Sequence, residues 1–229
     1  MNMINTNNRI SIQVGLSGYS FKIYADNELV RASEWISAEK VFSTPEFHDR
    51  YAQVDVSVFT PKCTLVPVRF HDLDRETAML SEVADIDVSG KVDSIDVTDY
   101  AAVMLYQDPV GESLAKVIAS TVLRQDAAPV RPLPEMYHML KQLAALPDYN
   151  RIIASYMDQV LYLAVAQGRT LLLCNSFAAP DFTTAEYFIF MVMKKFQLNP
   201  EMSVIYFRTP LDDEQEISLY RYFHGVEKI

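Results

Sequence analysis

The chain has 229 residues with a formal net charge of −10, and half of its residues are hydrophobic. This hydrophobic fraction is sufficient for a folded core and argues against a disordered chain. The negative charge opposes nonspecific binding to DNA or RNA, because such binding depends on Lys and Arg side chains that neutralise phosphates. The 6 glycines are scattered and form neither a Walker loop nor a Rossmann GxGxxG motif. We therefore predict no nucleic-acid partner and neither of these two phosphate-binding loops.

The cysteines and the apolar stretches indicate in which cellular compartment the protein is expected. Cys63 and Cys174 are too few for a disulfide framework, so we expect free buried thiols in a reducing compartment. The first residues lack a basic segment followed by an apolar run, and the longest apolar stretches, 160–166 and 188–193, are far shorter than the roughly 20 residues that span a bilayer. We therefore predict a cytoplasmic protein without direct membrane insertion.

The opening residues alternate between apolar and polar side chains, which is typical of half-buried strands. Residues 9–14, 20–25 and 29–36 are predicted strands. The turns between them are the sequence GLSG at 15–18 and the polar residues 26–28. Short turns between consecutive strands predict an antiparallel three-stranded meander.

Helices and strands are expected to alternate after this meander. We predict a helix after Ser37 that is interrupted near Pro45. Further strands are predicted at 54–58, 64–68 and 100–106, and Asp108 ends the last of them. Further helices are predicted at 73–83, 111–123 and 135–146. The acidic region 72–99 is interpreted as a solvated surface, with a cation or partner site as the alternative.

The strand and turn pattern of the opening returns later in the chain. Residues 152–156, 160–166 and 169–177 are predicted strands, followed by a helix at 182–196, a strand at 203–207 and a helix at 212–223. The helix at 182–196 is apolar on nearly every face, which predicts burial on both sides. The chain is therefore expected to be an α/β protein with two lobes, 1–98 and 99–229, each with a mixed sheet that opens in an antiparallel three-stranded meander.

Particular stretches carry a family resemblance. The opening ISIQVGLSGYSFKIY, the later strands LLLCNSF and SVIYF, and the helix and turn DFTTAEYFIFMVMKKFQLNPE are similar to an uncharacterised family of bacterial, mainly Bacteroidetes, proteins with an actin-like fold. The duplicated lobe resembles the actin-like ATPase superfamily more generally. The resemblance implies two RNase H-like lobes in an actin-like ATPase arrangement.

The resemblance also implies where a nucleotide would bind, namely two hairpin turns, one in each lobe. The first turn resembles D-x-G-[ST], but here Gln13 replaces the acid and Leu16 replaces the hydroxyl, while Gly15 is retained. An amide cannot replace a carboxylate as a hard anionic ligand of Mg²⁺. Ser17 and Gly18 could supply substitute donors.

The second turn and the adenosine-binding segment depart further from the superfamily. The second turn resembles D-x-G-G-[GS]-T, of which only Asp158 survives, because Val160 and Leu161 occupy glycine positions. The segment 203–210, where the superfamily has a Gly-Gly pair, contains no glycine.

These departures favour a non-catalytic actin-like scaffold or interaction module with a degenerate nucleotide site. The alternative is a divergent ATP-binding protein, ATPase or kinase that uses the interlobe cleft. The candidate cofactor-binding residues are Gly15, Ser17, Gly18 and Asp158. We expect no cofactor, with ATP and Mg²⁺ as the alternative, and no catalytic or metal-ligating residues. We also expect a protein partner, but the sequence reveals neither its identity nor the oligomeric state.

Aromatic residues close to the end of the chain have two interpretations. Tyr187, Phe188, Phe190, Tyr220, Tyr222 and Phe223 occupy the last two predicted helices. Such a cluster is commonly part of a core, but aromatic side chains are also enriched at the energetic centres of interfaces. A partner-binding surface therefore stays open as the alternative.

Overall fold

The computed structural model describes residues 8–87, 90–107 and 113–229. The chain folds into two compact units that are each discontinuous in sequence, whereas we predicted contiguous lobes that meet at residues 98 and 99. The first unit comprises 1–59 and 109–135, and the second comprises 60–108 and 136–229. The predicted strand end at Asp108 and helix start at Gly111 lie outside the described residues. The lobe boundary stays a prediction.

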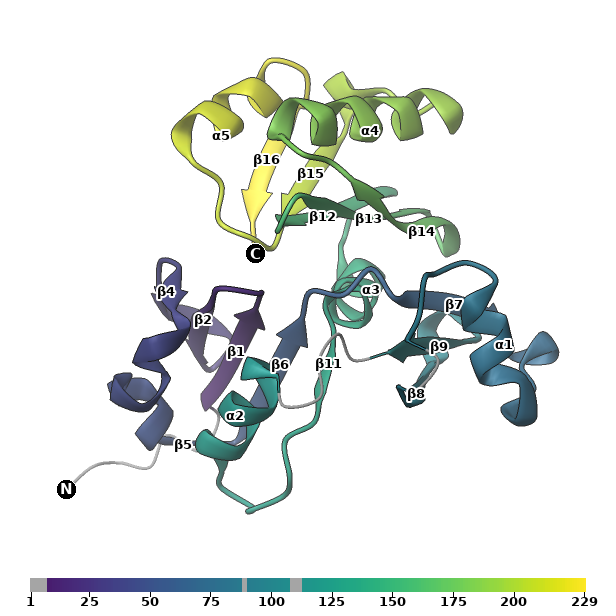
Figure 1. Cartoon of the computed structure of the whole chain (residues 1–229). Helices are drawn as coiled ribbons and strands as arrows, with labels where there is room; N and C mark the ends of the chain where they lie inside the picture. The colour runs from purple at the N-terminus through teal and green to yellow at the C-terminus, as the bar shows by residue number, and fades with distance from the viewer. Residues whose placement is uncertain (1–7, 88–89, 108–112) are drawn as a thin grey trace. The chain divides into compact units, whose positions relative to one another are not determined.

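The first unit contains a mixed six-stranded sheet in which the predicted meander is confirmed (Figure 1). The strands lie in the order β11-β6-β1-β2-β3, and β4 also pairs with β2. β1 is antiparallel to β2, β2 is antiparallel to β3, and β6 runs parallel to both β1 and β11. The bounds are β1 Asn8–Val14, β2 Gly18–Ala25, β3 Glu28–Ala32, β4 Ile36–Ser37, β6 Gln53–Val58 and β11 Pro132–Pro134. The predicted third strand is thus divided between β3 and β4.

Apolar side chains from alternate positions form the core of this unit. Ile10, Ile12 and Val14 on β1 share one face because successive side chains of a strand point to opposite faces. The helix α2, Leu114–Thr121, contributes Ala115 and Ile118 to the same core. Two 3-10 helices, η1 Ala38–Ser43 and η2 Pro45–His48, replace the predicted interrupted helix, and β5 Arg50–Tyr51 pairs with β10 Leu123–Arg124.

The second unit contains a five-stranded sheet in the order β14-β13-β12-β15-β16. Its strands are β12 Asn150–Met157, β13 Val160–Gln167, β14 Thr170–Ala178, β15 Val204–Phe207 and β16 Gly225–Lys228. β12, β13 and β14 form the second antiparallel meander, and β15 runs parallel to both β12 and β16. The first four strands of this order repeat the arrangement of β3-β2-β1-β6, so the predicted repeat of mixed sheets is confirmed.

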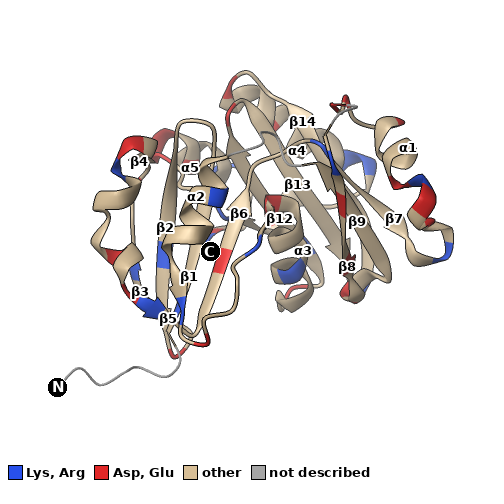
Figure 2. Cartoon of the chain, turned by 60° about the horizontal axis from the view of Figure 1, so that its bottom comes forward, with Lys and Arg blue, Asp and Glu red and all other residues tan. Residues whose placement is uncertain are grey.

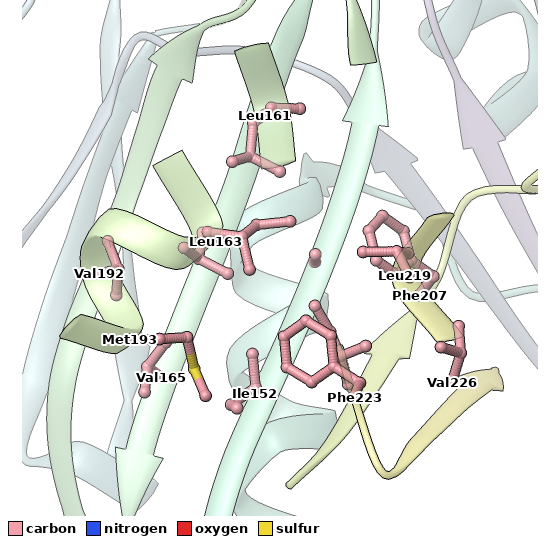
Figure 3. Packing of buried hydrophobic residues seen from close by; sticks show 14 of the residues in the cluster. Ile152, Leu161, Leu163, Val165, Val192, Met193, Phe207, Leu219, Phe223 and Val226 are labelled. Atoms are coloured by element: carbon pink, nitrogen blue, oxygen red, sulfur yellow. The ribbon is translucent and has the colours of Figure 1, made fainter. Parts of the chain in front are cut away.

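The helices α4 Phe182–Lys195 and α5 Asp213–Tyr220 cover one face of this sheet (Figure 1). Figure 3 shows Leu163 and Val165 of β13 beside Val192 and Met193 of α4, with Leu161 farther along the same strand in the same cluster. The prediction that α4 is buried on both sides is wrong. Ala185 and Ile189 lie in the core, but Tyr187 and Met191 are exposed, because α4 forms the outer layer and only one of its faces meets the sheet.

A smaller sheet and several helices complete the second unit. The three-stranded sheet has the order β7-β9-β8, with β7 Cys63–Pro67, β8 Val92–Val97 and β9 Ala102–Gln107. The helices are η3 Val68–Phe70, η4 Leu73–Arg75, α1 Glu76–Ser81, η5 Thr98–Tyr100, α3 Glu135–Ala145 and η6 Pro200–Met202. The first residue of α3, Glu135, belongs to the first unit. Among the described residues, no helix has the length and apolar character that crossing a bilayer requires. Both cysteines are free, and burial raises the pKa of the Cys63 thiol to about 12.

Candidate functional site

The first candidate turn connects β1 to β2 in the first unit. The backbone N–H of Gly15 donates to the carbonyl oxygen of Gly18 at 3.0 Å and closes the loop. The carbonyl oxygen of Ser17 accepts the N–H of Ala38 at 3.1 Å, which ties the loop to the start of η1. Leu16 has 75% of its surface exposed. The loop is therefore held through its backbone, and the bulky side chain at its tip points into solvent.

The requirement for glycine at position 18 has a structural explanation that does not involve a ligand. A Cβ atom at this position would lie 2.1 Å from the carbonyl oxygen of Ile36 and 2.8 Å from Nε1 of Trp35. Both distances are far below van der Waals contact, because β4 pairs with β2 at this glycine and its backbone comes close to Gly18. The close approach of two backbone segments thus explains this glycine.

The side chain of Gln13 occupies the position of the missing acid. It lies near the end of β1, is 5% exposed, and its Nε2 donates to Oε1 of Glu135 at 2.8 Å. Glu135 is the first residue of α3 and is 0% exposed. The amide is therefore committed to a buried carboxylate of the same unit and contributes no anionic oxygen to the turn.

The sheet register explains how Gln13 reaches Glu135. β6 lies between β1 and β11, and Gln13 pairs with Ser57, which in turn pairs with Leu133. Glu135 follows Leu133 by two residues, just beyond the end of β11. Ser57 has a small, fully buried side chain between them. The Gln13 side chain can therefore extend across β6 at the carboxyl ends of these parallel strands.

Glu135 is the residue of this site that sequence reasoning missed. The connector with Pro129, Pro132 and Pro134 predicts a helix that starts at this point, and acids are common in the first turn of a helix. A fully buried acid there is uncommon, because burial of an ionised carboxylate is costly without partners. Only the pairing of β11 with β6 reveals the burial.

The second candidate turn connects β12 to β13 in the second unit. Asp158 and Gln159 have φ angles of 51° and 63°, and the flanking Met157 and Val160 pair directly. Two central residues with positive φ define a tight hairpin turn of type I′. Asp26 and Asn27 form a turn of the same type between β2 and β3, with φ angles of 51° and 67°. The conformation of Asp158 thus matches that of an ordinary hairpin residue.

The residues that follow Asp158 belong to the strand and not to a loop. Val160, Leu161 and Tyr162 are paired on both sides, with β12 and with β14. Leu161 is 0% exposed and packs in the core beneath α4 (Figure 3). The turn therefore lacks the extended glycine-rich loop that the superfamily motif would place here.

The segment after β15 is filled by side chains. Arg208 and Thr209 are 4% and 2% exposed. Arg208 donates through Nη1 to Oε1 of Gln142, and Oγ1 of Thr209 accepts the N–H of Tyr156 at 3.0 Å. Hydrogen bonds within the second unit thus engage both residues where the superfamily has a glycine pair.

Acidic and sulfur ligands do not converge on a metal site in the part of the chain that the structure describes. His71 pairs with Glu76 at 2.7 Å, and the side chain of Asp72 accepts the N–H of Asp74. Taken separately, neither the Gly15–Gly18 loop nor the Asp158 turn provides the donor set that the superfamily motifs use for a magnesium nucleotide.

A family model described as "Protein of unknown function (DUF3822)" matches residues 2–226. The chain belongs to this family. A Bacteroides thetaiotaomicron protein with an actin-like ATPase fold and unknown function is similar to this DUF3822 chain, with a TM-score of 0.65 and 15% sequence identity over 98% of this chain and 91% of that chain. The PilM–PilN type IV pilus biogenesis complex contains a second similar chain, with a TM-score of 0.52 and 12% identity over 96% of this chain and 88% of that chain. No curated protein matches the chain.

These comparisons confirm the predicted family resemblance and the actin-like fold. At identities this low they concern the fold alone, and function must be argued from the residues of the site.

Proposed function

We propose that this DUF3822 protein is a non-catalytic actin-like scaffold or interaction module whose nucleotide site has degenerated. The observation that carries the proposal is the hydrogen bond from Gln13 to Glu135, which engages the side chain at the acid position of the first turn. The type I′ turn at Asp158 and the buried Arg208 support it from the second unit. The alternative is a divergent ATP-binding protein or ATPase that uses Gly15, Ser17, Gly18 and Asp158.

A protein partner fits this proposal better than a metabolite. The similar chain of the pilus biogenesis complex belongs to an assembly of PilM with PilN, so this fold can serve protein recognition. In the DUF3822 chain, Tyr187, Tyr220 and Tyr222 on and after the outer helices are each at least half exposed. The ring of Tyr222 lies 4.8 Å from that of Phe190, so its orientation is fixed by the core. Rigid, exposed aromatic side chains are suited to bind a protein surface.

The experiment that tests the absence of catalysis is phosphate release from ATP with Mg²⁺. We expect the wild-type protein, Ser17→Ala and Asp158→Asn to release phosphate at the same background rate. Release by the wild-type protein that Asp158→Asn abolishes while the circular dichroism spectrum is unchanged would establish the divergent enzyme instead.

The partner surface has its own test. Partners that copurify with the wild-type protein are identified and then compared between variants. We expect Tyr187→Asp and Tyr222→Asp to lose the same partner, whereas Tyr149→Ser retains it, because Tyr149 is 70% exposed but lies outside the helices. Retention by all three variants would exclude this surface.

A further inference from the structure

The first unit contains a pocket of about 440 Å³ next to α2. β5 and β10 contribute Arg50 and Arg124, and the start of β11 contributes Pro132. This is the amino end of the parallel strands β6 and β11, whereas the Gly15–Gly18 loop follows the carboxyl end of β1. The pocket therefore lies at the other end of the sheet from the candidate nucleotide turn.

The charge of this pocket is opposite to that of the chain. Arg50, Lys116 and Arg124 line it, and no carboxylate is among the described residues that do so, although the chain carries a net charge of −10. Figure 2 shows basic segments at β5 and on α2. The guanidinium of Arg124 forms two hydrogen bonds with the carboxylate of Asp126, at 2.9 and 2.6 Å, so Arg124 is paired with an acid of the adjoining loop. Arg50 and Lys116, both exposed, are the other two basic residues of the lining.

The rest of the lining is mainly apolar. Val122, Leu123, Pro129 and Val130 contribute to the walls, and Leu123 keeps 46% of its surface exposed. The loop that forms one wall folds back through a hydrogen bond from the N–H of Ala127 to the carbonyl oxygen of Arg124 at 3.2 Å. Pockets of this size with apolar walls and a few convergent polar groups are typical of small-molecule sites.

We infer that this pocket binds a small organic anion with an apolar body. A carboxylate or phosphate headgroup would contact the side chains of Arg50 and Lys116, since both donate hydrogen bonds to such oxygens. The apolar body would cover Leu123 and Val130, which removes their apolar surface from water. A free molecule and the headgroup of a membrane lipid share this chemistry, so the test must separate the two sources.

Isothermal titration calorimetry with octyl phosphate tests the inference on the full chain at low salt. We expect saturable binding of octyl phosphate at one site and no saturation with octanol or with inorganic phosphate. Binding should weaken when the salt concentration is raised to about 0.5 M, because salt screens charges and the Debye length is already only about 10 Å at 0.1 M. The double variant Arg50→Gln/Lys116→Gln should weaken binding at least about tenfold, equivalent to 1.4 kcal/mol. The matched control is Arg169→Gln/Lys195→Gln, which removes two exposed basic residues of the second unit and should bind like the wild-type protein.

A second variant tests the apolar wall. Leu123→Asp should abolish binding, because it places a carboxylate at the mouth of the pocket. Equal affinity of the wild-type protein and the Arg50→Gln/Lys116→Gln variant would overturn the inference, as would binding of inorganic phosphate that is as tight as that of octyl phosphate. Binding to vesicles that contain phosphatidic acid without binding of free octyl phosphate would assign the pocket to a membrane surface and overturn the small-molecule ligand.

Discussion

Nε2 of Gln13 donates a hydrogen bond to Oε1 of Glu135 over 2.8 Å, between two residues 122 positions apart in the chain. Both side chains are buried, one at the end of a strand and the other at the start of a helix. The bond joins the first segment of the first unit to the last and satisfies a buried carboxylate oxygen. A typical intramolecular hydrogen bond contributes about 0.5–1.5 kcal/mol to stability, and a buried acceptor left without its donor costs about 1–3 kcal/mol, so this is a substantial interaction for a single unit.

Removal of the donor should therefore destabilise the first unit. Gln13→Met keeps a side chain of similar length without the N–H group, and we expect it to lower the free energy of unfolding by about 1–3 kcal/mol, the cost of a buried acceptor left without its donor. Urea titrations at neutral pH measure the change. Gln53→Met, at an exposed position of β6, is the matched control and should stay within about 0.5 kcal/mol of the wild-type value.

The pair can be isolated by a double-mutant cycle. Gln13→Met/Glu135→Leu removes both polar partners, so it should destabilise less than the sum of the two single variants, with a coupling energy of about 0.5–3 kcal/mol. Strict additivity of the two changes would show that Gln13 and Glu135 do not interact in solution.

Gly18 and Gly225 provide a matched pair of glycine substitutions. Gly18→Ala would place Cβ 2.1 Å from the carbonyl oxygen of Ile36, and we expect a loss of about 1–3 kcal/mol or failure to fold. Gly225→Ala would meet the side chain of Val204 at 3.4 Å, which is ordinary contact, and should have little effect on stability. Thermal unfolding followed by circular dichroism compares them. A stable Gly18→Ala protein would contradict the close approach of β4 to β2.

The turn at Asp158 should become more stable when glycine replaces Gln159. The φ angle of Gln159 is 63°, a left-handed conformation that costs non-glycine residues roughly 1–2 kcal/mol. We expect Gln159→Gly to raise the urea midpoint by an amount equivalent to about 0.5–1 kcal/mol. The control Gln53→Gly introduces glycine inside a strand and should lower it by about 0.5–1 kcal/mol. A lower midpoint for Gln159→Gly would mean that the turn has another conformation.

Alkaline pH should destabilise the protein through its buried tyrosines. Burial, together with the nearby Asp49 and Glu46, raises the pKa of Tyr51 to about 12. The unfolded chain loses this proton near pH 10, so the contribution of Tyr51 to stability is complete below pH 10 and is lost between pH 10 and about 12. The slope for one such group approaches about 1.4 kcal/mol per pH unit.

Tyr51→Phe should reduce the loss of the free energy of unfolding between pH 10 and about 12. Tyr149→Phe, at a position that is 70% exposed, should leave this loss unchanged. Urea titrations from pH 8 to 12 provide the comparison. Burial and the hydrogen bond to Asp148 raise the pKa of Tyr206 to about 12 as well, so some dependence should persist in the Tyr51 variant.

The sequence predicted much of this fold because alternation and turn residues are local signals. Ile10, Ile12 and Val14 identify β1, and Asp158 and Gly168 mark the turns of the second meander. The short strand β16 was missed, since four residues that include Glu227 and Lys228 carry little apolar pattern and the strand depends on its pairing with β15.

The candidate site was harder to predict because its residues meet through long-range pairing. Gln13 was recognised as the wrong residue for a metal ligand, but its partner Glu135 could not be located from spacing along the chain. Tyr187 on α4 was predicted to be buried because a helix that is apolar on nearly every face gives no sign of which face meets the sheet.

The most direct test of the central claim is an equilibrium titration of the wild-type protein with Mg²⁺ and labelled ATP. We predict no saturable binding up to about 1 mM nucleotide, which corresponds to less than about 4 kcal/mol of binding free energy. Micromolar binding with turnover, lost in Asp158→Asn, would contradict the account and establish a functional nucleotide site.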